Sequence, residues 1–581
     1  MKARYFFSLI IYCILAVSCQ KNFLDQTPQV IISEHEFWKT SNDLKLYANN
    51  YYNTMLPSYA GYFEVGYYGL DADLGSDNMI KSPYNTELNG EAVVPASGGG
   101  WDWTTLRTLN YFMANYGKVN DTWDNVKPYV GETLFFRAYF YFNMLKRFGG
   151  LPWINEPLSS QDSLKLYGAR LPRNIIVDSI LHDLDQAIAY LPARAEGPAA
   201  RLNRETAMLF QSRVALYEGT WEKYHAGTPF GVTGQNGTVY LQKAATVAGE
   251  LLNNSGGYSL DNVGVPNAYR EIFNQSDYGN SKEVMLWRKF DNAQGLSNRW
   301  YLFVPLGLDR GITKSLVDDY LCTDGQPISS SSRYKGDDSL LHVVANRDPR
   351  LSQTIFVPGS IITSNRPGNA QNIIFQQPDL ANSANAPTGY ELLKGHMTTA
   401  SQQVENSTQA LIYFRFGEVL LNYAEALAEL GTLSQADVDK SINKLRERVG
   451  MVPLQLGSIT PDPNWLFPGL SPVINEVRRE RRVELACEGF RHDDIFRWAA
   501  AGSQILNWKP KGAKLKQWAT LFPAEVLNKY PVDDQGYIEF FKNIPAMSAG
   551  YKFKVNRDYL SPLPADQLVL NPALGGNNPG W

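Results

Sequence analysis

The sequence contains few cysteines and histidines, and the short motifs in which these residues hold metals are missing. Its 581 residues include four cysteines and six histidines. Because neither a CxxC nor an HExxH motif occurs, the sequence predicts no zinc site and no thiol chemistry, and we expect no cofactor and no metal. Cys322 and Cys487 lie far apart, so a disulfide framework is not expected. The sequence leaves open whether these two pair.

An excess of positive charge is also absent. The formal net charge is −4, and it becomes −6 when Lys2 and Arg4 are removed with the leader segment described below. Charges of both signs are interspersed, which argues against nucleic acid or an anionic membrane surface as the ligand. Aromatic residues, in contrast, make up 13% of the chain, with 33 tyrosines and 13 tryptophans. Their flat apolar faces and polar tips suit sugar rings and protein interfaces alike.

The apolar run at the start of the chain is too short to cross a membrane. Residues 5–17 are almost wholly apolar and follow Lys2 and Arg4. This pattern is typical of a secretory signal, whereas a spanning helix needs about 20 residues. We therefore predict that residues 1–18 are a signal peptide.

The run Ala16-Val17-Ser18-Cys19 is similar to a bacterial lipobox, although Leu is usual at the Ala16 position. It predicts lipidation of Cys19 and a tether over residues 19–31. Two or more acyl chains hold a protein stably on a membrane. The alternative is cleavage near Ser18 by the general signal peptidase, with an incidental cysteine.

Helical periodicity dominates much of the remaining chain. Residues 37–56 are predicted to form the first helix, and ETLFFRAYFYFNMLKRFGG is a long amphipathic segment that stops at its glycines. NRETAMLFQSRVALYEGT with YLQKAATVAGELLNNSGG, and YFRFGEVLLNYAEALAELG with ADVDKSINKLRERVG, have the pattern of helical hairpins. Ala beside Leu and Tyr is typical of tetratricopeptide packing, but no strict period of roughly 34 residues occurs. We expect a mostly α fold of helical hairpins with little β structure.

The densest charge pattern is INEVRRERRVELACEGFRHDDIFRW, residues 474–498. Residues 474–488 are predicted to form one helix that ends at Gly489, before a second short helix. Rows of like charge weaken an isolated helix by a few tenths of a kcal/mol per pair, so each row is expected to face opposite charge on other helices. We interpret the cluster as structural, although paired carboxylates can also do acid and base work. The two rows are Glu480, Glu484 and Glu488, and Arg478 and Arg482.

ERRVELACEGFRHDDIFRW resembles the signature ER..EL..EG.R..DL.RW of the SusD/RagB family of outer-membrane nutrient-binding lipoproteins. RAYFYFNMLKRFGGLPWI, GEVLLNYAEALAELG and YLSPLPADQLVLNPALGGNNPGW resemble further family blocks, in family order. The resemblance implies a single helical body over residues 32–581, with halves at about 32–225 and 270–581. It implies four tetratricopeptide-like helix pairs that bear irregular ligand-binding loops. It also implies a surface position on the outer membrane and a partner, a TonB-dependent SusC-like transporter that the protein covers as a lid.

Two irregular stretches carry the candidate ligand contacts. Residues 57–100 lose helical periodicity, and residues 287–311 contain a second polar, glycine-containing loop. A sugar needs an aromatic platform and polar side chains for its hydroxyl groups, and both stretches offer this mixture. Trp103 also begins an amphipathic helix and is as readily expected in the core. The predicted ligand-binding residues are Asp73, Asn78, Tyr84, Trp101 and Trp103 in and after the first stretch, and Arg299, Trp300 and Tyr301 in the second.

These observations favour a protein that binds oligosaccharide or polysaccharide fragments and delivers them to its transporter. The alternative is a peptide-binding or other nutrient-binding lid of the same transporter type. A surface glycosidase would need two carboxylates roughly 5 to 10 Å apart, such as Asp73 with Asp77 or Asp102. No catalytic motif supports that reading, so we do not expect an enzyme.

Overall fold

The computed structural model describes residues 37–57, 72–261, 267–298, 309–364, 371–382, 386–402 and 406–581. The fold is mostly helical, as expected. The longer helices are α3 (Ser41–Thr54), α4 (Thr104–Asn115), α5 (Trp123–Phe148), α7 (Arg173–Tyr190), α8 (Arg204–Tyr224), α9 (Thr238–Asn253), α15 (Phe416–Leu430) and α18 (Pro472–Glu484).

Shorter helices fill the second half of the chain and the connections. They are α6 (Ser163–Leu166), α10 (Ala268–Glu271), α12 (Lys314–Asp319), α13 (Leu340–Val344), α14 (Pro349–Thr354), α16 (Gln435–Asp439), α17 (Ile442–Arg448), α19 (Arg491–Arg497), α20 (Ala501–Gln504), α21 (Ala524–Leu527) and α22 (Ala565–Leu570).

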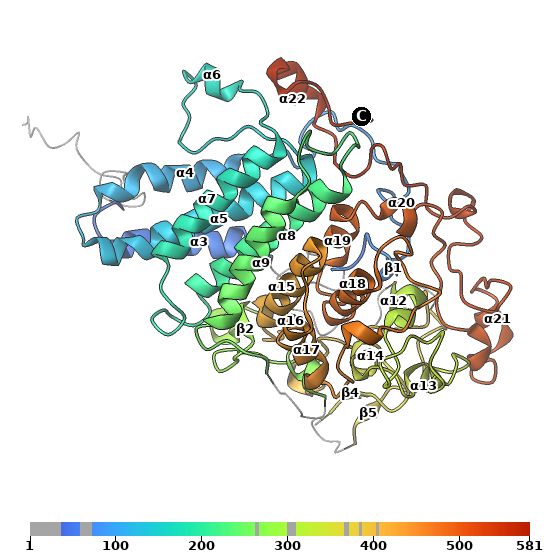
Figure 1. Cartoon of the computed structure of the whole chain (residues 1–581). Helices are drawn as coiled ribbons and strands as arrows, with labels where there is room; N and C mark the ends of the chain where they lie inside the picture. Colours follow the sequence, from blue (N-terminus) through green and yellow to red (C-terminus); the bar gives the residue numbers. More distant parts are fainter. Residues whose placement is uncertain are drawn as a thin grey trace, which may run out of the picture.

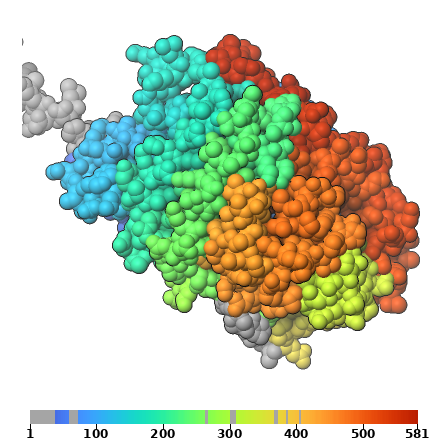
Figure 2. Space-filling model, viewed as in Figure 1, coloured from blue at the N-terminus to red at the C-terminus, as the bar shows by residue number. Residues whose placement is uncertain are grey.

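The long helices pack side by side in a curved array. Helix α5 contacts α7, α7 contacts α8, α8 contacts α9, α9 contacts α15, and α15 contacts α18, while α3 and α4 lie on α5 (Figure 1). The predicted hairpin of α8 and α9 is confirmed. At its turn, a Cβ on Gly237 would lie 1.8 Å from the carbonyl oxygen of Gly219, so the two helices can meet there only through glycine. Figure 2 shows this face, with the N-terminal helices on the left and the C-terminal segment along the right edge.

Strands are short and paired in twos within the described part of the chain. All three pairs are antiparallel. They join β1 (Met79–Lys81) to β3 (Arg310–Ile312), β2 (Val284–Arg288) to β6 (Leu411–Arg415), and β4 (Ile361–Thr363) to β5 (Ile373–Ile374). Each pair therefore joins segments that are distant in sequence or separated by a loop, and none forms a sheet that could organise the core.

The apolar core has two main parts. The larger one joins α3, α4, α5, α7, α8, α9 and α15 to residues of the C-terminal segment, from Leu485 to Leu574. The smaller one is built by α12, α13 and α14 with residues around Tyr390 and Trp518. Val483 and Ala486 belong to the smaller core and Leu485 to the larger, so the end of α18 lies between the two.

Helix α18 is buried along most of its length despite its charge. Every residue from 475 to 484 is buried. The helix ends at Glu484 and not at residue 488 as predicted. The following residues form a turn in which Cys487 and Gly489 both have positive φ, at 62° and 84°. This turn exposes backbone groups that a longer helix would have used internally, and they bind side chains from elsewhere, as described below.

The prediction that each charged row faces opposite charge is confirmed. Glu484 lies 2.9 Å from Arg350, 2.8 Å from Arg415 and 2.5 Å from Arg448. All four side chains are at most 2% exposed. The other members of the two rows are paired in the same way: Glu480 with Arg350 and Arg446, Glu488 with Arg415 and Lys394, Arg478 with Glu429, and Arg482 with Asp77 and Asp319.

Candidate functional site

The two irregular stretches meet in space. Strand β1 of the first stretch pairs with β3, which lies at the end of the second stretch, in the register Met79 to Ile312 and Lys81 to Arg310. The pairing is extended by a hydrogen bond from the Ser82 backbone NH to the Asp309 carbonyl, at 3.0 Å. Loops more than 200 residues apart in sequence therefore form one surface, and this is the arrangement that a shared ligand site requires.

A hollow of about 390 Å³, open to solvent, lies beside this ribbon. Tyr551 closes one side of it, with its ring stacked on Trp508 at 5.7 Å and its hydroxyl accepting the Asn85 NH at 3.3 Å. Sequence reasoning did not find Tyr551, because it comes from a C-terminal segment with no pattern that marks it. The hollow is lined by Leu74, Gly75, Ser76, Met79, Ile80, Lys81, Pro83, Asn85, Leu88 and Tyr551.

Tyr84 lies close to this hollow and is partly exposed. Its hydroxyl donates to Glu91 at 3.0 Å, and its ring meets Phe541 edge-on at 6.2 Å. The hydrogen bond to Glu91 raises the pKa of Tyr84, so this side chain is a neutral phenol at physiological pH. Tyr84 thus offers a partly exposed aromatic face with a polar tip held in place, and its contact with a ligand stays a prediction.

Asp73 and Asn78 lie in the interior instead, at 0% and 1% exposure. The Asp73 carboxylate accepts hydrogen bonds from the Asn78 amide at 2.7 Å and from the backbone NH groups of Cys487 and Gly489 at 2.8 and 3.0 Å. Asn78 in turn accepts from the Arg482 guanidinium at 2.8 Å. Neither side chain presents an atom to a ligand in this structure. They fasten the first irregular stretch to the turn after α18.

The other two acidic residues that a glycosidase could use, Asp77 and Asp102, each bind a partner within the protein. Arg491 binds Asp77 through two hydrogen bonds of 2.6 and 2.9 Å, and Arg482 lies 3.0 Å away. Burial alone would raise the pKa of Asp77, but the two arginines outweigh it and lower that pKa to about 2. Asp102 is exposed and accepts the Thr104 NH at 2.8 Å, at the start of α4. None of these groups is held as a proton donor in a cleft.

Trp101 and Trp103 are brought together at the start of α4. Their ring centroids are 5.2 Å apart, and Trp101 also meets Phe148 edge-on at 5.0 Å. Both indoles are partly exposed, so each has one side in the core and one side in solvent. Trp103 therefore packs against the core with part of its ring, and its contact with a ligand stays a prediction.

The glycines before Trp101 form a packed turn. Residues 98–100 all have positive φ, between 55° and 79°. The φ of 79° at Gly100 favours glycine, and a Cβ there would also lie 2.2 Å from a guanidinium nitrogen of Arg147, which would have to move. The turn thus sets the position of the Trp101 backbone, whose NH donates to the Gly98 carbonyl at 2.9 Å.

Several predicted residues lie outside the described part of the chain. They are Arg299, Trp300 and Tyr301 of the second stretch, and the lipidation candidate Cys19. Their positions remain predictions from sequence. Two described residues flank the second group in sequence: Asn298, which pairs with Ser407, and Asp309, which adjoins the β1–β3 ribbon.

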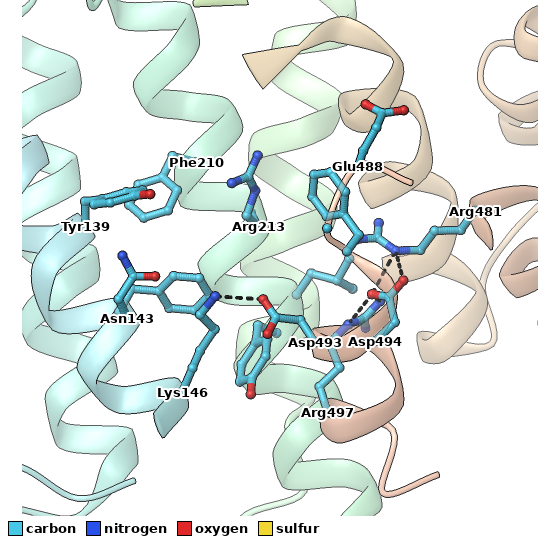
Figure 3. Close-up of a pocket in the computed structure, with 15 residues that line it drawn as sticks. Tyr139, Asn143, Lys146, Phe210, Arg213, Arg481, Glu488, Asp493, Asp494 and Arg497 are labelled. Carbon is cyan, nitrogen blue, oxygen red and sulfur yellow. Dashed lines mark hydrogen bonds and ion pairs between the residues drawn. The ribbon is translucent and has the colours of Figure 1, made fainter. Parts of the chain in front are cut away.

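A second hollow, of about 580 Å³, lies between α5, α8 and the segment that joins α18 to α19 (Figure 3). Lys146 on its wall lies 2.7 Å from Asp493, which also carries a pKa lowered to about 2, because Lys146 outweighs the effect of burial. Arg213 binds Glu418 through two hydrogen bonds of 2.6 Å. These charges are already balanced within the protein, so the hollow gives no reason to place a charged ligand in it.

The described part of the chain has neither a metal-binding cluster nor a membrane-spanning helix. Among them, no group of three or more His, Cys, Asp or Glu side chains could hold a metal ion. Within the same residues, none of the helices is both long and apolar enough to span a bilayer. Cys322 and Cys487 are free thiols in this structure, so they do not form a disulfide with each other.

The described chain is thus an array of helical hairpins that carries irregular loops. A model of the SusD family matches residues 307–581, and a model described as starch-binding and associating with the outer membrane matches residues 104–216. The chain belongs to the SusD/RagB family. This family comprises carbohydrate- or nutrient-binding proteins associated with the outer membrane, and its members are generally not catalysts.

Individual relatives are distant in sequence but cover most or all of the chain. SusD-like protein P2 of Formosa agariphila is 24% identical over 588 residues, covering 100% of both chains. SusD-like protein P38 of the same organism is 22% identical and covers 83% of this chain and 88% of its own. Among solved structures, a SusD-like carbohydrate-binding protein from Bacteroides fragilis has 20% identity and a TM-score of 0.70, covering 93% of this chain and 99% of its own. At this identity the structural match establishes the fold.

Proposed function

We propose that this protein is lipid-anchored at Cys19 on the outer membrane, binds oligosaccharide or polysaccharide fragments, and delivers them to a TonB-dependent SusC-like transporter. The observation that carries the proposal is the β1–β3 ribbon, which unites the two irregular stretches at one surface. The aromatic and polar side chains in and beside these stretches supply the chemistry that a sugar needs. Family membership supports the same class of ligand.

The ligand surface has two proposed parts. One part is the hollow beside the ribbon, with Tyr84 at its edge and Arg299, Trp300 and Tyr301 supplied by the second stretch. The other is the partly exposed pair Trp101 and Trp103. Asp73 and Asn78 have no place in it, because they hold the loop from inside.

Glycan array binding by the mature protein, with a peptide library in parallel, tests the proposal. We expect binding to glycans, and we expect Trp101→Ala and Trp300→Ala each to weaken it by about 10-fold, because an aromatic contact contributes roughly 0.5–1.5 kcal/mol beyond the area it buries. Both variants should keep the wild-type circular dichroism spectrum. Binding to peptides with no binding to any glycan would favour the alternative nutrient class. Unchanged glycan affinity in both variants would remove the proposed placement of the site.

Delivery to a transporter has its own test. If the protein is the lid of a SusC-like barrel, an affinity tag on it should recover that barrel from detergent-solubilised outer membranes of the native cell. Recovery should not depend on Trp101. Failure to recover any outer-membrane barrel would contradict the partner and leave sugar binding standing.

A further inference from the structure

Helix α5 has an aromatic group at each of its two ends. Trp101, part of the proposed ligand surface, packs on Phe148, the last residue of the helix. Trp123 is the first residue. The helix has 26 residues, and at about 1.5 Å per residue its ends are roughly 38 Å apart. The two groups are therefore too distant to share one short ligand.

Trp123 is unusually exposed for its type. It is 46% exposed, more than any other tryptophan in the described part of the chain. Tryptophan is on average highly buried, and one exposed indole alone would carry no argument, so the rings that frame it matter. A ring that is held in place and open to solvent is a platform for the apolar face of another molecule.

Two tyrosines frame this indole. Tyr190, the last residue of α7, meets it edge-on at a centroid distance of 5.2 Å and an angle of 87°. Tyr116 lies 6.5 Å away and is tilted by 48°. Tyr116 is itself stacked on Phe112 of the core at 6.3 Å. The frame thus connects the exposed ring to the core through aromatic contacts and limits its motion.

Polar groups flank Trp123 in sequence at the start of α5, with Asp121 two residues before it and Asn125 two residues after it. Asp121 accepts hydrogen bonds from the Asn125 amide at 2.8 Å and from the Thr122 NH at 2.7 Å. The hydrogen bonds from Asn125 and Ser41 lower the pKa of Asp121 to about 2, so its carboxylate is charged at any physiological pH. An aromatic face together with a carboxylate and an amide held at the same helix end is a combination that suits a sugar ring and its hydroxyl groups.

We propose that Trp123, with Tyr116, Tyr190, Asp121 and Asn125, is a second carbohydrate platform that holds a polysaccharide at the end of α5 remote from Trp101. The inference rests on the proposed function, because it assumes that the principal ligand is a glycan. Two platforms on one chain increase affinity only for a ligand long enough to reach both. This corner lies at the left end of the helical array in Figure 1.

The test separates long from short ligands. Native gels cast with starch, laminarin, xylan or yeast mannan measure the retardation of the mature protein by each polymer. Calorimetry then measures binding of a short oligosaccharide prepared from any polymer that retards it. For Trp123→Ala we expect affinity for the polymer to fall by about 5-fold, with affinity for the short oligosaccharide unchanged. Asn125→Ala, which leaves the aromatic packing intact, should weaken polymer binding by about 2-fold.

Two controls make the result specific. Leu164→Ala removes an apolar side chain that is 92% exposed on α6 and should leave both affinities unchanged. Trp101→Ala should weaken binding of polymer and oligosaccharide alike. If Trp123→Ala and Asn125→Ala bind every retarding polymer as the wild type does while Trp101→Ala does not, the second platform is refuted and the proposed function stands. If no polymer retards the wild type, both proposals fail.

Discussion

At the residue scale, the side chain with most consequence for stability is Glu484. It is fully buried and bound by Arg350, Arg415 and Arg448. Burial alone would raise its pKa, but these three arginines lower it well below its usual range. Buried charges are stable only while their partners are present, since a lone charge in the interior is very costly. The network therefore joins α14, β6, α17 and α18, and loss of one charged member leaves the others buried without their partner.

We predict that Glu484→Gln lowers the free energy of unfolding by about 3–5 kcal/mol, because the arginines keep their charge and lose their common anion. Urea unfolding monitored by circular dichroism measures the change. Lys444→Met is the matched control. It breaks a pair with Glu447 in which both side chains are more than half exposed, and such pairs contribute about 0–1 kcal/mol. A loss below 1 kcal/mol for Glu484→Gln would contradict the structural reading of the network.

Glu391 is a second residue with a measurable signature. Its carboxyl group is buried and accepts one hydrogen bond, from the Asp379 NH at 3.0 Å. Burial raises its pKa from 4.5 to about 8. The group is therefore neutral in the folded protein at pH 7 and ionised when the chain unfolds.

Because the folded pKa is the higher one, the stability due to neutral Glu391 is complete below pH 4.5 and is lost as the pH rises to about 8. We predict that its contribution to the free energy of unfolding falls by roughly 1.4 kcal/mol per pH unit between about pH 5 and 8. Glu391→Gln should remove this slope and be more stable than the wild type at pH 8. Thermal melts of both proteins from pH 5 to 8 test it, and parallel curves would contradict it.

Asp73 and Asn78 show where residue-level prediction fails. An acidic and an amide side chain in a glycine-rich stretch are usually exposed, and nothing local indicates otherwise. Their partners are backbone NH groups of Cys487 and Gly489 and the side chain of Arg482, about 400 residues later. Those NH groups are available only because α18 ends at Glu484, a boundary that the sequence pattern placed at residue 488.

At the scale of elements, the sequence predicted those features that depend on neighbouring residues, such as helix ends and helical hairpins. Helix α5 ends before Gly149, whose φ is 72°, and α8 and α9 form the expected hairpin. The opposite charges facing α18 could be predicted because unpaired rows would be unstable in any fold. The β1–β3 ribbon could not be predicted, because strands of three residues carry no periodicity and their pairing joins distant segments.

The ribbon itself can be tested at Gly311 in β3. A Cβ at this position would lie 2.3 Å from the hydroxyl oxygen and 2.9 Å from the Cβ of Thr388, which is buried. We predict that Gly311→Ala displaces β3 and weakens glycan binding by at least about 10-fold, while the helices keep their far-ultraviolet spectrum.

The matched control is Gly457→Ala, because a Cβ there meets no atom within 4 Å. It should bind glycan as the wild type does. Hydrogen exchange gives an independent measurement, since the Ser82 NH, which is bonded to Asp309 in the native structure, should exchange faster in Gly311→Ala only. Wild-type exchange and binding in Gly311→Ala would show that the ribbon does not shape the site.

At the scale of the whole molecule, the proposed position in the cell depends on the lipidation predicted at Cys19. The prediction that Cys19 carries lipid comes from sequence alone. We expect Cys19→Ala to abolish incorporation of radiolabelled palmitate and to move the protein from the membrane fraction to the soluble fraction, because the remaining chain loses its acyl chains. Glycan affinity of the purified protein should not change. Palmitate incorporation into Cys19→Ala would contradict the assignment.

The first irregular stretch depends on the last residues of the chain. The backbone NH groups of Ala565 and Asp566 donate to the carbonyls of Pro95 and Ala96, and Arg557 donates to the Gly90 carbonyl at 2.8 Å. Residues 90–96 therefore have these partners only while the C-terminal segment from residue 557 onward is present. We therefore expect proteolytic removal of the final 25 residues to release residues 90–96 and to weaken ligand binding, while most of the helices remain folded.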